Sequence, residues 1–162
     1  MDIDIREYCQ ADEEAVVRLS LRAWAPVFAS MEEVLGTEIS TRLNGADWRD
    51  YQAKSVRDTL SDLAVRAWVA QRDDQVTGFV AATIRDKQRL LGEVVMLAVD
   101  PPDQGGGVGT ALTHHATAWL RESGMKVAMI GTGGDRGHAP ARHVYEKAEY
   151  QLFPMARYFK AL

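Results

Sequence analysis

The sequence predicts a single domain of the α/β or α+β class, with strands and helices around one core. Three observations support this prediction. Short runs of β-branched and aromatic residues alternate with longer segments that carry apolar residues at helical spacing. The 162 residues are 46% hydrophobic and 26% charged, enough apolar material for one ordinary domain over 1–162. A glycine-rich loop at 105–109 joins a predicted strand to a predicted helix, an arrangement typical of anion-binding sites.

The first part of the chain predicts one strand followed by three helices. Ile3 and Ile5 alternate with charged residues, which indicates a half-buried strand over 2–6. Asp12 is expected to cap a helix that Pro26 ends, because proline disrupts a helix interior. Two more helices, separated by an Asn-Gly turn, are expected over residues 31–43 and 47–63.

Three strands are expected in the middle of the chain. Residues 65–71 and 76–84 are rich in β-forming residues, and Asp73-Asp74 between them favours a hairpin. Residues 92–99 form a third apolar run, which leads directly into the glycine-rich loop. The next helix is expected over 107–123, because Gly124 is a typical residue after a helix end.

The last part of the chain predicts one more helix among three strands. The continuous apolar run 127–130 suits a central strand that is buried on both faces. A helix is expected over 139–148, with Pro140 in its first turn, after a flexible loop at 132–137. Two final strands are expected, over 150–153 and 156–159, on either side of Pro154.

The glycine-rich loop does not match two common phosphate-binding motifs. Thr110 and Leu112 stand where the dinucleotide motif G-x-G-x-x-G needs its third glycine, which argues against nicotinamide and flavin cofactors. No Gly-Lys pair follows, which argues against hydrolysis of ATP or GTP. The simplest alternative is a turn that only caps a helix.

Two motifs resemble those of the GCN5-related N-acetyltransferase (GNAT) superfamily. The first is Gln104-x-x-Gly107-x-Gly109, which is similar to the superfamily's [RQ]-x-x-G-x-[GA] loop for the pyrophosphate of coenzyme A. The second is the run 138–150, HAPARHVYEKAEY, which is similar to N-x-x-A-x-x-x-Y-E-K-x-G-[FY]. The order of predicted elements also resembles that fold, a mostly antiparallel mixed sheet of about seven strands with a splayed fourth and fifth pair, flanked by helices.

The resemblance implies which residues bind the co-substrate acetyl-CoA. Backbone groups of the fourth strand would hold the pantetheine arm, with the Leu97 N–H at the thioester carbonyl, and the loop would hold the diphosphate. The residues so implied are Leu97, Ala98, Val99, Gln104, Gly105, Gly106, Gly107, Val108, Gly109, Thr110 and His138. His138 replaces the usual asparagine, which leaves its role open, and Glu149 replaces the usual glycine after the helix.

Acetyl transfer to an amine needs a base and an acid, and the resemblance implies one candidate for each. Tyr145 stands where the superfamily has a tyrosine that protonates the departing thiolate, and its free pKa of about 10 suits a thiol of pKa roughly 8 to 9. Glu93 stands where several members carry a general base, with a solvated carboxylate at a strand start as the alternative. Trp24 and Phe28 belong to the helices that would form a wall of the acceptor pocket, or they simply pack those helices onto the sheet.

The resulting hypothesis is transfer of an acetyl group from acetyl-CoA to a primary amine of a small molecule, by direct attack in a ternary complex. The alternatives are a protein N-terminus, a lysine or an aminoglycoside as acceptor, or a protein that senses acyl-CoA without catalysis. The net charge of −4 argues against a nucleic-acid partner, and no apolar run is long enough for a membrane. Cys9 and the four histidines lack metal-ligand spacing, so no metal is expected. A cytoplasmic location is expected, and a homodimer stays open because dimers are common in the superfamily.

Overall fold

The computed structural model describes residues 3–162 and contains one mixed sheet of five strands in the order β1-β2-β3-β4-β5. Adjacent strands are antiparallel except β4 and β5, which are parallel. The first expected strand is present, although its predicted first residue, Asp2, lies outside the described residues. The strands are β1 (Asp4–Glu7), β2 (Val65–Arg72), β3 (Gln75–Asp86), β4 (Leu91–Val99) and β5 (Val127–Ile130).

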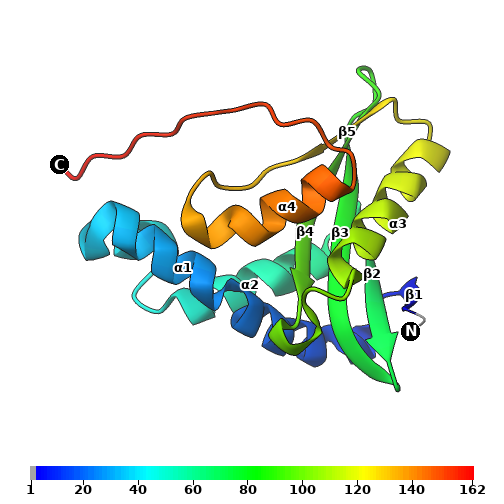
Figure 1. Cartoon of the computed structure of the whole chain (residues 1–162), viewed down its shortest axis with the longest axis horizontal. Helices are drawn as coiled ribbons and strands as arrows, with labels where there is room; N and C mark the ends of the chain where they lie inside the picture. The colour runs from blue at the N-terminus through cyan, green and yellow to red at the C-terminus, as the bar shows by residue number, and fades with distance from the viewer. Residues whose placement is uncertain (1–2) are drawn as a thin grey trace.

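Four α-helices surround this sheet (Figure 1). They are α1 (Glu13–Asn44), α2 (Trp48–Ser61), α3 (Val108–Glu122) and α4 (Ala139–Lys147), with short 3-10 turns η1 (Gln10–Asp12), η2 (Pro101–Asp103) and η3 (Arg136–His138). Within residues 3–162, every helix is too short or too polar to cross a lipid bilayer.

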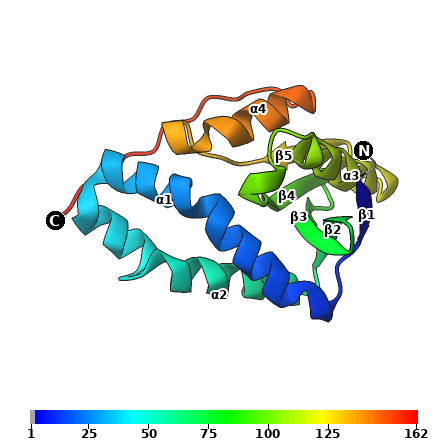
Figure 2. The same cartoon turned by 60° about the horizontal axis from the view of Figure 1, so that its bottom comes forward.

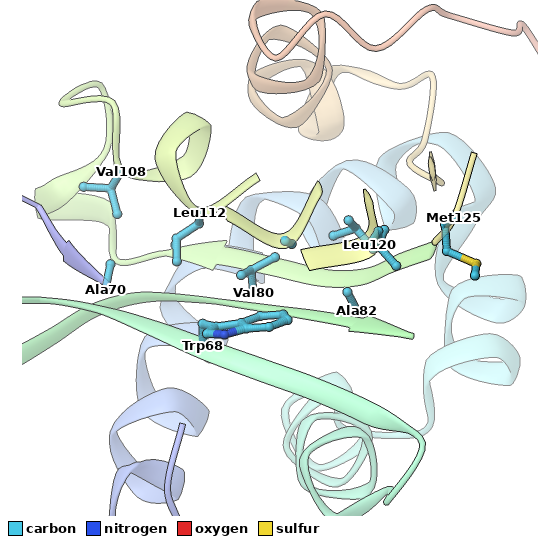
Figure 3. Packing of buried hydrophobic residues seen from close by; sticks show 10 residues of the cluster. Trp68, Ala70, Val80, Ala82, Val108, Leu112, Leu120 and Met125 are labelled. Carbon is cyan, nitrogen blue, oxygen red and sulfur yellow. The ribbon is translucent and has the colours of Figure 1, made fainter. Parts of the chain in front are cut away.

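Each face of the sheet has its own hydrophobic core. On one face, α1 and α2 lie together, and Val16, Leu19 and Val56 pack on Phe79 of β3; Figure 2 shows this pair of helices on one side of the sheet. On the other face, Leu112 and Leu120 of α3 lie over Val80, Ala82 and Trp68, as Figure 3 shows. The sheet is therefore buried on both sides, which leaves its edges and strand ends for binding.

Helix α1 does not end at Pro26, so that prediction is wrong. The helix continues to Asn44 and contains one interruption, at Gly36, whose φ of 79° and ψ of 160° are not helical. Pro26 removes one backbone hydrogen bond, but the buried Phe28 that follows it contributes apolar contacts that offset the loss. The segment expected as a separate helix over 31–43 is therefore the second half of α1.

Asp12 precedes α1 as predicted, but its carboxylate does not cap that helix. It accepts two hydrogen bonds from the Arg6 guanidinium, each of 2.8 Å, and one of 2.9 Å from the Cys9 backbone N–H. The hydrogen bonds from Arg6 lower the pKa of this buried carboxyl to about 2. Asp12 therefore ties the start of α1 to β1.

Strand β4 carries a bulge where it separates from β5. Met96 pairs with Ala81 and Val94 pairs with Ala82, so Val95 is the extra residue on β4. Pairing between β4 and β5 ends at Val94 and Ile130. Beyond this point β4 continues to Val99 without a strand partner on that side, so its backbone is free on that edge.

Strand β5 lies at the edge of the sheet and is only partly buried, which corrects the prediction of a central strand buried on both faces. Residues 150–153 and 156–159 form no strands, so the expected total of about seven is wrong. A strand needs a partner, and this final segment runs along α4 toward α1 with Phe153, Met155 and Tyr158 exposed (Figure 1).

Candidate active site

The glycine-rich loop between β4 and α3 presents unpaired backbone groups. Gly105 and Gly107 have φ values of 80° and 86°, a left-handed conformation that favours glycine. Gly107 directly precedes α3, and no side chain caps the first turn of that helix. A Cβ at Gly105 or Gly107 would meet no atom within 4 Å. The N–H groups at the start of α3 are therefore accessible to an anion.

The other loop residues predicted to bind the cofactor lie around this opening. Gln104 is exposed, and its Nε2 donates a 2.9 Å hydrogen bond to the Val99 carbonyl at the end of β4. The remaining ones are exposed Gly106, half-buried Thr110, and buried Val108 and Gly109. The loop is thus fixed to the free edge of β4 through Gln104.

A cavity of about 260 Å³ opens where β4 and β5 separate. Its walls come from α1, α2, β4, the end of β5, the following loop and α4. The lining residues are Trp24, Val27, Gln52, Val94, Val95, Met96, Leu97, Ile130, Gly131, Thr132, His138, Ala141 and Tyr145. Four residues predicted for the site, Trp24, Leu97, His138 and Tyr145, therefore meet in one cavity. Ala98 and Val99 continue β4 beyond it, toward the loop.

Tyr145 of α4 lines this cavity and is half-buried. Burial raises the pKa of its hydroxyl to about 12. The hydroxyl therefore stays protonated at neutral pH and serves as a hydrogen-bond donor. A phenol with this pKa holds its proton more tightly than the free tyrosine on which the sequence prediction was based.

His138 belongs to a network that the sequence did not predict. Its Nδ1 contacts Asp135 Oδ1, and Asp135 Oδ2 also accepts a 2.5 Å hydrogen bond from Ser30 Oγ of α1. Ser30 Oγ in turn accepts a 3.0 Å hydrogen bond from the Gly137 N–H. The only hint in the sequence is the spacing of three residues between Asp135 and His138; Ser30 is more than 100 residues away.

Glu93 lies beside the cavity and is not among its lining residues. Gly92 and Val94, its neighbours on β4, face α3, so the Glu93 side chain lies on the opposite face of the sheet. There it forms an ion pair with Arg85 of β3. This carboxylate is therefore already engaged with a cation.

The two aromatic residues predicted for the acceptor pocket differ in position. Trp24 lines the cavity and makes an edge contact with Phe79, with ring centroids 6.5 Å apart. Phe28 is buried and stacks on Trp48 at 4.5 Å, so it packs α1 against α2. Sequence reasoning missed Gln52 of α2, a buried polar residue that lines the cavity.

The α1 wall of the cavity is attached to neighbouring elements at two points. Arg22 forms two hydrogen bonds with Asp100, of 2.8 and 2.6 Å, at the end of β4. Ser30 is bonded to the loop before α4 through Asp135. Trp24 and Val27 lie between these attachments. Within residues 3–162, no three histidine, cysteine or acidic side chains are grouped as a metal site requires.

Comparison with known sequences identifies one family of acetyltransferases. Residues 31–150 match the model described as "Acetyltransferase (GNAT) family". A mycothiol acetyltransferase from Actinosynnema mirum is 33% identical over 139 residues, which cover 84% of this chain and 40% of that protein. One from Streptomyces coelicolor is 38% identical over 80 residues, 49% of this chain and 25% of that protein. The chain thus spans less than half the length of these relatives.

Solved structures share the fold at low sequence identity. An aminoglycoside antibiotic 6'-N-acetyltransferase from Acinetobacter haemolyticus has a TM-score of 0.66 and 15% identity, with 98% of each chain covered. The PaiA N-acetyltransferase from Thermoplasma acidophilum, solved in complex with coenzyme A, has a TM-score of 0.64 and 17% identity, with 91% of this chain and 88% of that chain covered.

Proposed function

Because the chain belongs to the GNAT acetyltransferase family, whose members use acetyl-CoA, we propose that it acetylates a primary amine of a small molecule by direct attack in a ternary complex. The observation that carries this proposal is the position of Tyr145 beside the unpaired edge of β4 in one cavity. An acyl donor and an acceptor must both reach this cavity for direct transfer.

The glycine-rich loop, the edge of β4 and the cavity follow one another, an arrangement that suits an extended ligand such as coenzyme A. The diphosphate would bind the backbone N–H groups of 104–110, where Gly105 and Gly107 leave open space. The pantetheine arm would then pair, as an added strand does, with the backbone of Leu97, Ala98 and Val99 along the edge of β4 that β5 leaves uncovered. There it would take the place of the Gln104 side chain at the Val99 carbonyl. Its thioester would enter the cavity beside Leu97 and Tyr145.

The reaction itself joins the amine nitrogen to the thioester carbonyl carbon and breaks the bond from that carbon to sulfur. The Leu97 N–H would stabilise the oxyanion of the tetrahedral intermediate. Tyr145 would donate a hydrogen bond to the sulfur as it leaves. Because the pKa of about 12 for Tyr145 lies above that of a thiol, Tyr145 would stabilise the thiolate by a hydrogen bond and keep its own proton.

The cavity lining favours an acceptor with one reactive amine on a neutral body. Gln52, Thr132, His138 and Tyr145 supply polar groups, and the other lining residues are apolar or glycine. Carboxylates, which recognise polycations by charge, do not contribute to this lining. The names of the curated relatives support a small-molecule acceptor, and a protein N-terminus, a lysine or an aminoglycoside remains the alternative.

The proposal is tested by coenzyme A release from acetyl-CoA with a panel of amines, together with calorimetric binding of coenzyme A. We expect turnover with at least one small amine that carries no other charge. Turnover with that amine should be faster than with peptides or aminoglycosides. Binding without turnover for the whole panel would instead support an acyl-CoA sensor.

A pair of glycine variants tests the loop. Gly107→Ala forces an alanine into a left-handed conformation at the diphosphate site, and we expect coenzyme A affinity to fall about tenfold. Gly124→Ala imposes the same strain at the other end of α3, where φ is 88°, and should leave affinity unchanged. Equal losses in both variants would contradict a diphosphate site at the loop.

A further inference from the structure

The loop between β5 and α4 holds a carboxylate on which three donors converge. Asp135 accepts hydrogen bonds from Ser30 Oγ at 2.5 Å, from the Gly137 N–H at 3.2 Å and from His138 Nδ1. Burial alone would raise the pKa of Asp135, but the hydrogen bonds from Ser30 and His138 outweigh it and lower the pKa overall. Asp135 is therefore an ionised acceptor at neutral pH.

An ionised carboxylate determines which nitrogen of His138 carries the proton. Because Asp135 can only accept, the proton of the neutral imidazole is on Nδ1. Nε2 then has its lone pair available. His138 lines the cavity that also contains Tyr145, so this lone pair belongs to the only imidazole among the cavity-lining residues.

The loop before α4 packs closely around His138 and Asp135. A Cβ added at Gly133 would overlap both the His138 ring and the Asp135 carboxylate, and one added at Gly137 would lie 2.6 Å from Ser30 Cβ. Arg142 of α4 donates to the carbonyls of Gly133 and Asp135, at 2.6 and 2.8 Å. These contacts fix the loop against both α1 and α4.

We propose that His138 is the catalytic base that accepts the proton of the attacking amine, and that Asp135, held by Ser30, is the residue that positions it. This role rests on the proposed acetyltransferase function and replaces the cofactor contact predicted for His138. As the carbon–nitrogen bond forms, the nitrogen's excess proton passes to Nε2 while the carbon–sulfur bond breaks. Tyr145 donates a hydrogen bond to the departing thiolate, which takes its proton from solvent, and His138 releases its proton to solvent.

His138 fits this role better than Glu93. The Glu93 carboxylate is paired with Arg85 and lies outside the cavity lining. A base in that position would first have to release Arg85 or act through water. His138 lines the cavity directly.

The charged and titratable groups near His138 determine how a pH profile of the enzyme is interpreted. Asp135 contacts the ring, while Arg142 and Tyr145 approach from α4. Residues lining the cavity from α1, α2, β4 and β5 are uncharged. Glu33 of α1 is paired with Arg136 at the surface, 2.6 Å apart. An acidic limb that disappears on replacing His138 alone is therefore attributable to this side chain.

The test compares His138→Asn with His143→Asn, the same change at an exposed site on α4. We expect His138→Asn to lower kcat about 10²-fold near neutral pH and to remove the acidic limb of the pH profile. Coenzyme A affinity and melting temperature should match those of His143→Asn. Unchanged turnover, or a loss of coenzyme A affinity in place of turnover, would overturn the proposal.

Two further variants separate catalysis from structure. Added imidazole should restore turnover to His138→Ala in proportion to its concentration, which a packing role does not predict. Asp135→Asn should lower kcat without changing coenzyme A affinity, and nitrogen NMR should show that the wild-type ring is protonated at Nδ1 and the variant ring is not fixed in that form. A wild-type protein inactive with every amine would overturn both proposals, whereas activity that survives in His138→Asn overturns only this one.

Discussion

The hydroxyl groups of Thr117 and Tyr150 lie 2.6 Å apart and join α3 to the segment that follows α4. Thr117 already donates its single proton to the Thr113 carbonyl, at 2.8 Å. Tyr150 must therefore be the donor to Thr117. This bond, with the 3.0 Å backbone bond from Tyr150 N to the Tyr145 carbonyl, holds the C-terminal end of α4.

The first prediction concerns this bond. Tyr150→Phe removes the donor and should lower the free energy of unfolding by about 1 kcal/mol, measured by urea denaturation. Tyr158→Phe is the matched control, because Tyr158 is 92% exposed and its loss should change nothing. Equal stability in the two variants would show that the hydroxyl pair contributes nothing.

The second prediction concerns Tyr145. Tyr145→Phe should retain coenzyme A affinity and lose at least tenfold in turnover, because the departing sulfur loses its donor. Since burial raises the Tyr145 pKa to about 12, the protonated form persists to higher pH than in a free tyrosine. Wild-type activity should accordingly show no loss from Tyr145 ionisation below about pH 10. Stopped assays across pH, with Tyr158→Phe alongside, provide the measurement; near-normal turnover would assign the acid elsewhere.

The third prediction concerns Glu93. Glu93→Gln should change kcat by less than about threefold, because the carboxylate is engaged with Arg85 and not with the acceptor. Arg85→Gln breaks the same pair from the other side and should behave alike. A loss confined to Glu93→Gln and largest at mildly acidic pH would make Glu93 the base and argue against His138.

The fourth prediction concerns Asp12 and the pH dependence of stability. Its pKa is lowered from 3.8 to about 2, chiefly by the hydrogen bonds from Arg6. The stabilisation is therefore complete above pH 3.8 and is lost as the pH falls toward 2. At pH 7, Asp12→Asn should lower the free energy of unfolding by about 2 kcal/mol, and the difference should vanish near pH 2.

Asp58→Asn is the control for this measurement, because Asp58 belongs to an exposed pair with Lys54. It should change stability by less than about 1 kcal/mol at any pH. If Asp12→Asn lowered the free energy of unfolding by the same amount at every pH, lost packing would be the cause.

Local signals in the sequence were sufficient for much of the fold. The hairpin at Asp73-Asp74 is confirmed, with both residues at positive φ. The helix predicted over 107–123 is present as α3, because Gly107 is its N-cap and Gly124 follows its C-cap. The two C-terminal strands were wrong because an apolar run reveals propensity, whereas a strand depends on a partner elsewhere in the chain.

The candidate site shows the same difference between local signals and tertiary packing. That Tyr145 and His138 lie close together could be predicted, because they occur in a motif of consecutive residues, and both line the cavity. Ser30 and Gln52 could not, because α1 and α2 bring them to the cavity through tertiary packing alone. The predicted helix end at Pro26 is wrong because tertiary contacts outweigh a local helix-breaking preference.

The attachments of α1 at Arg22 and Ser30 are about two helical turns apart and enclose Trp24 and Val27. This stretch of helix cannot slide or tilt without breaking one of them. Any ligand that enters this cavity therefore meets a preorganised surface on α1, and the conformational entropy lost on association falls mainly on the ligand and on the facing wall.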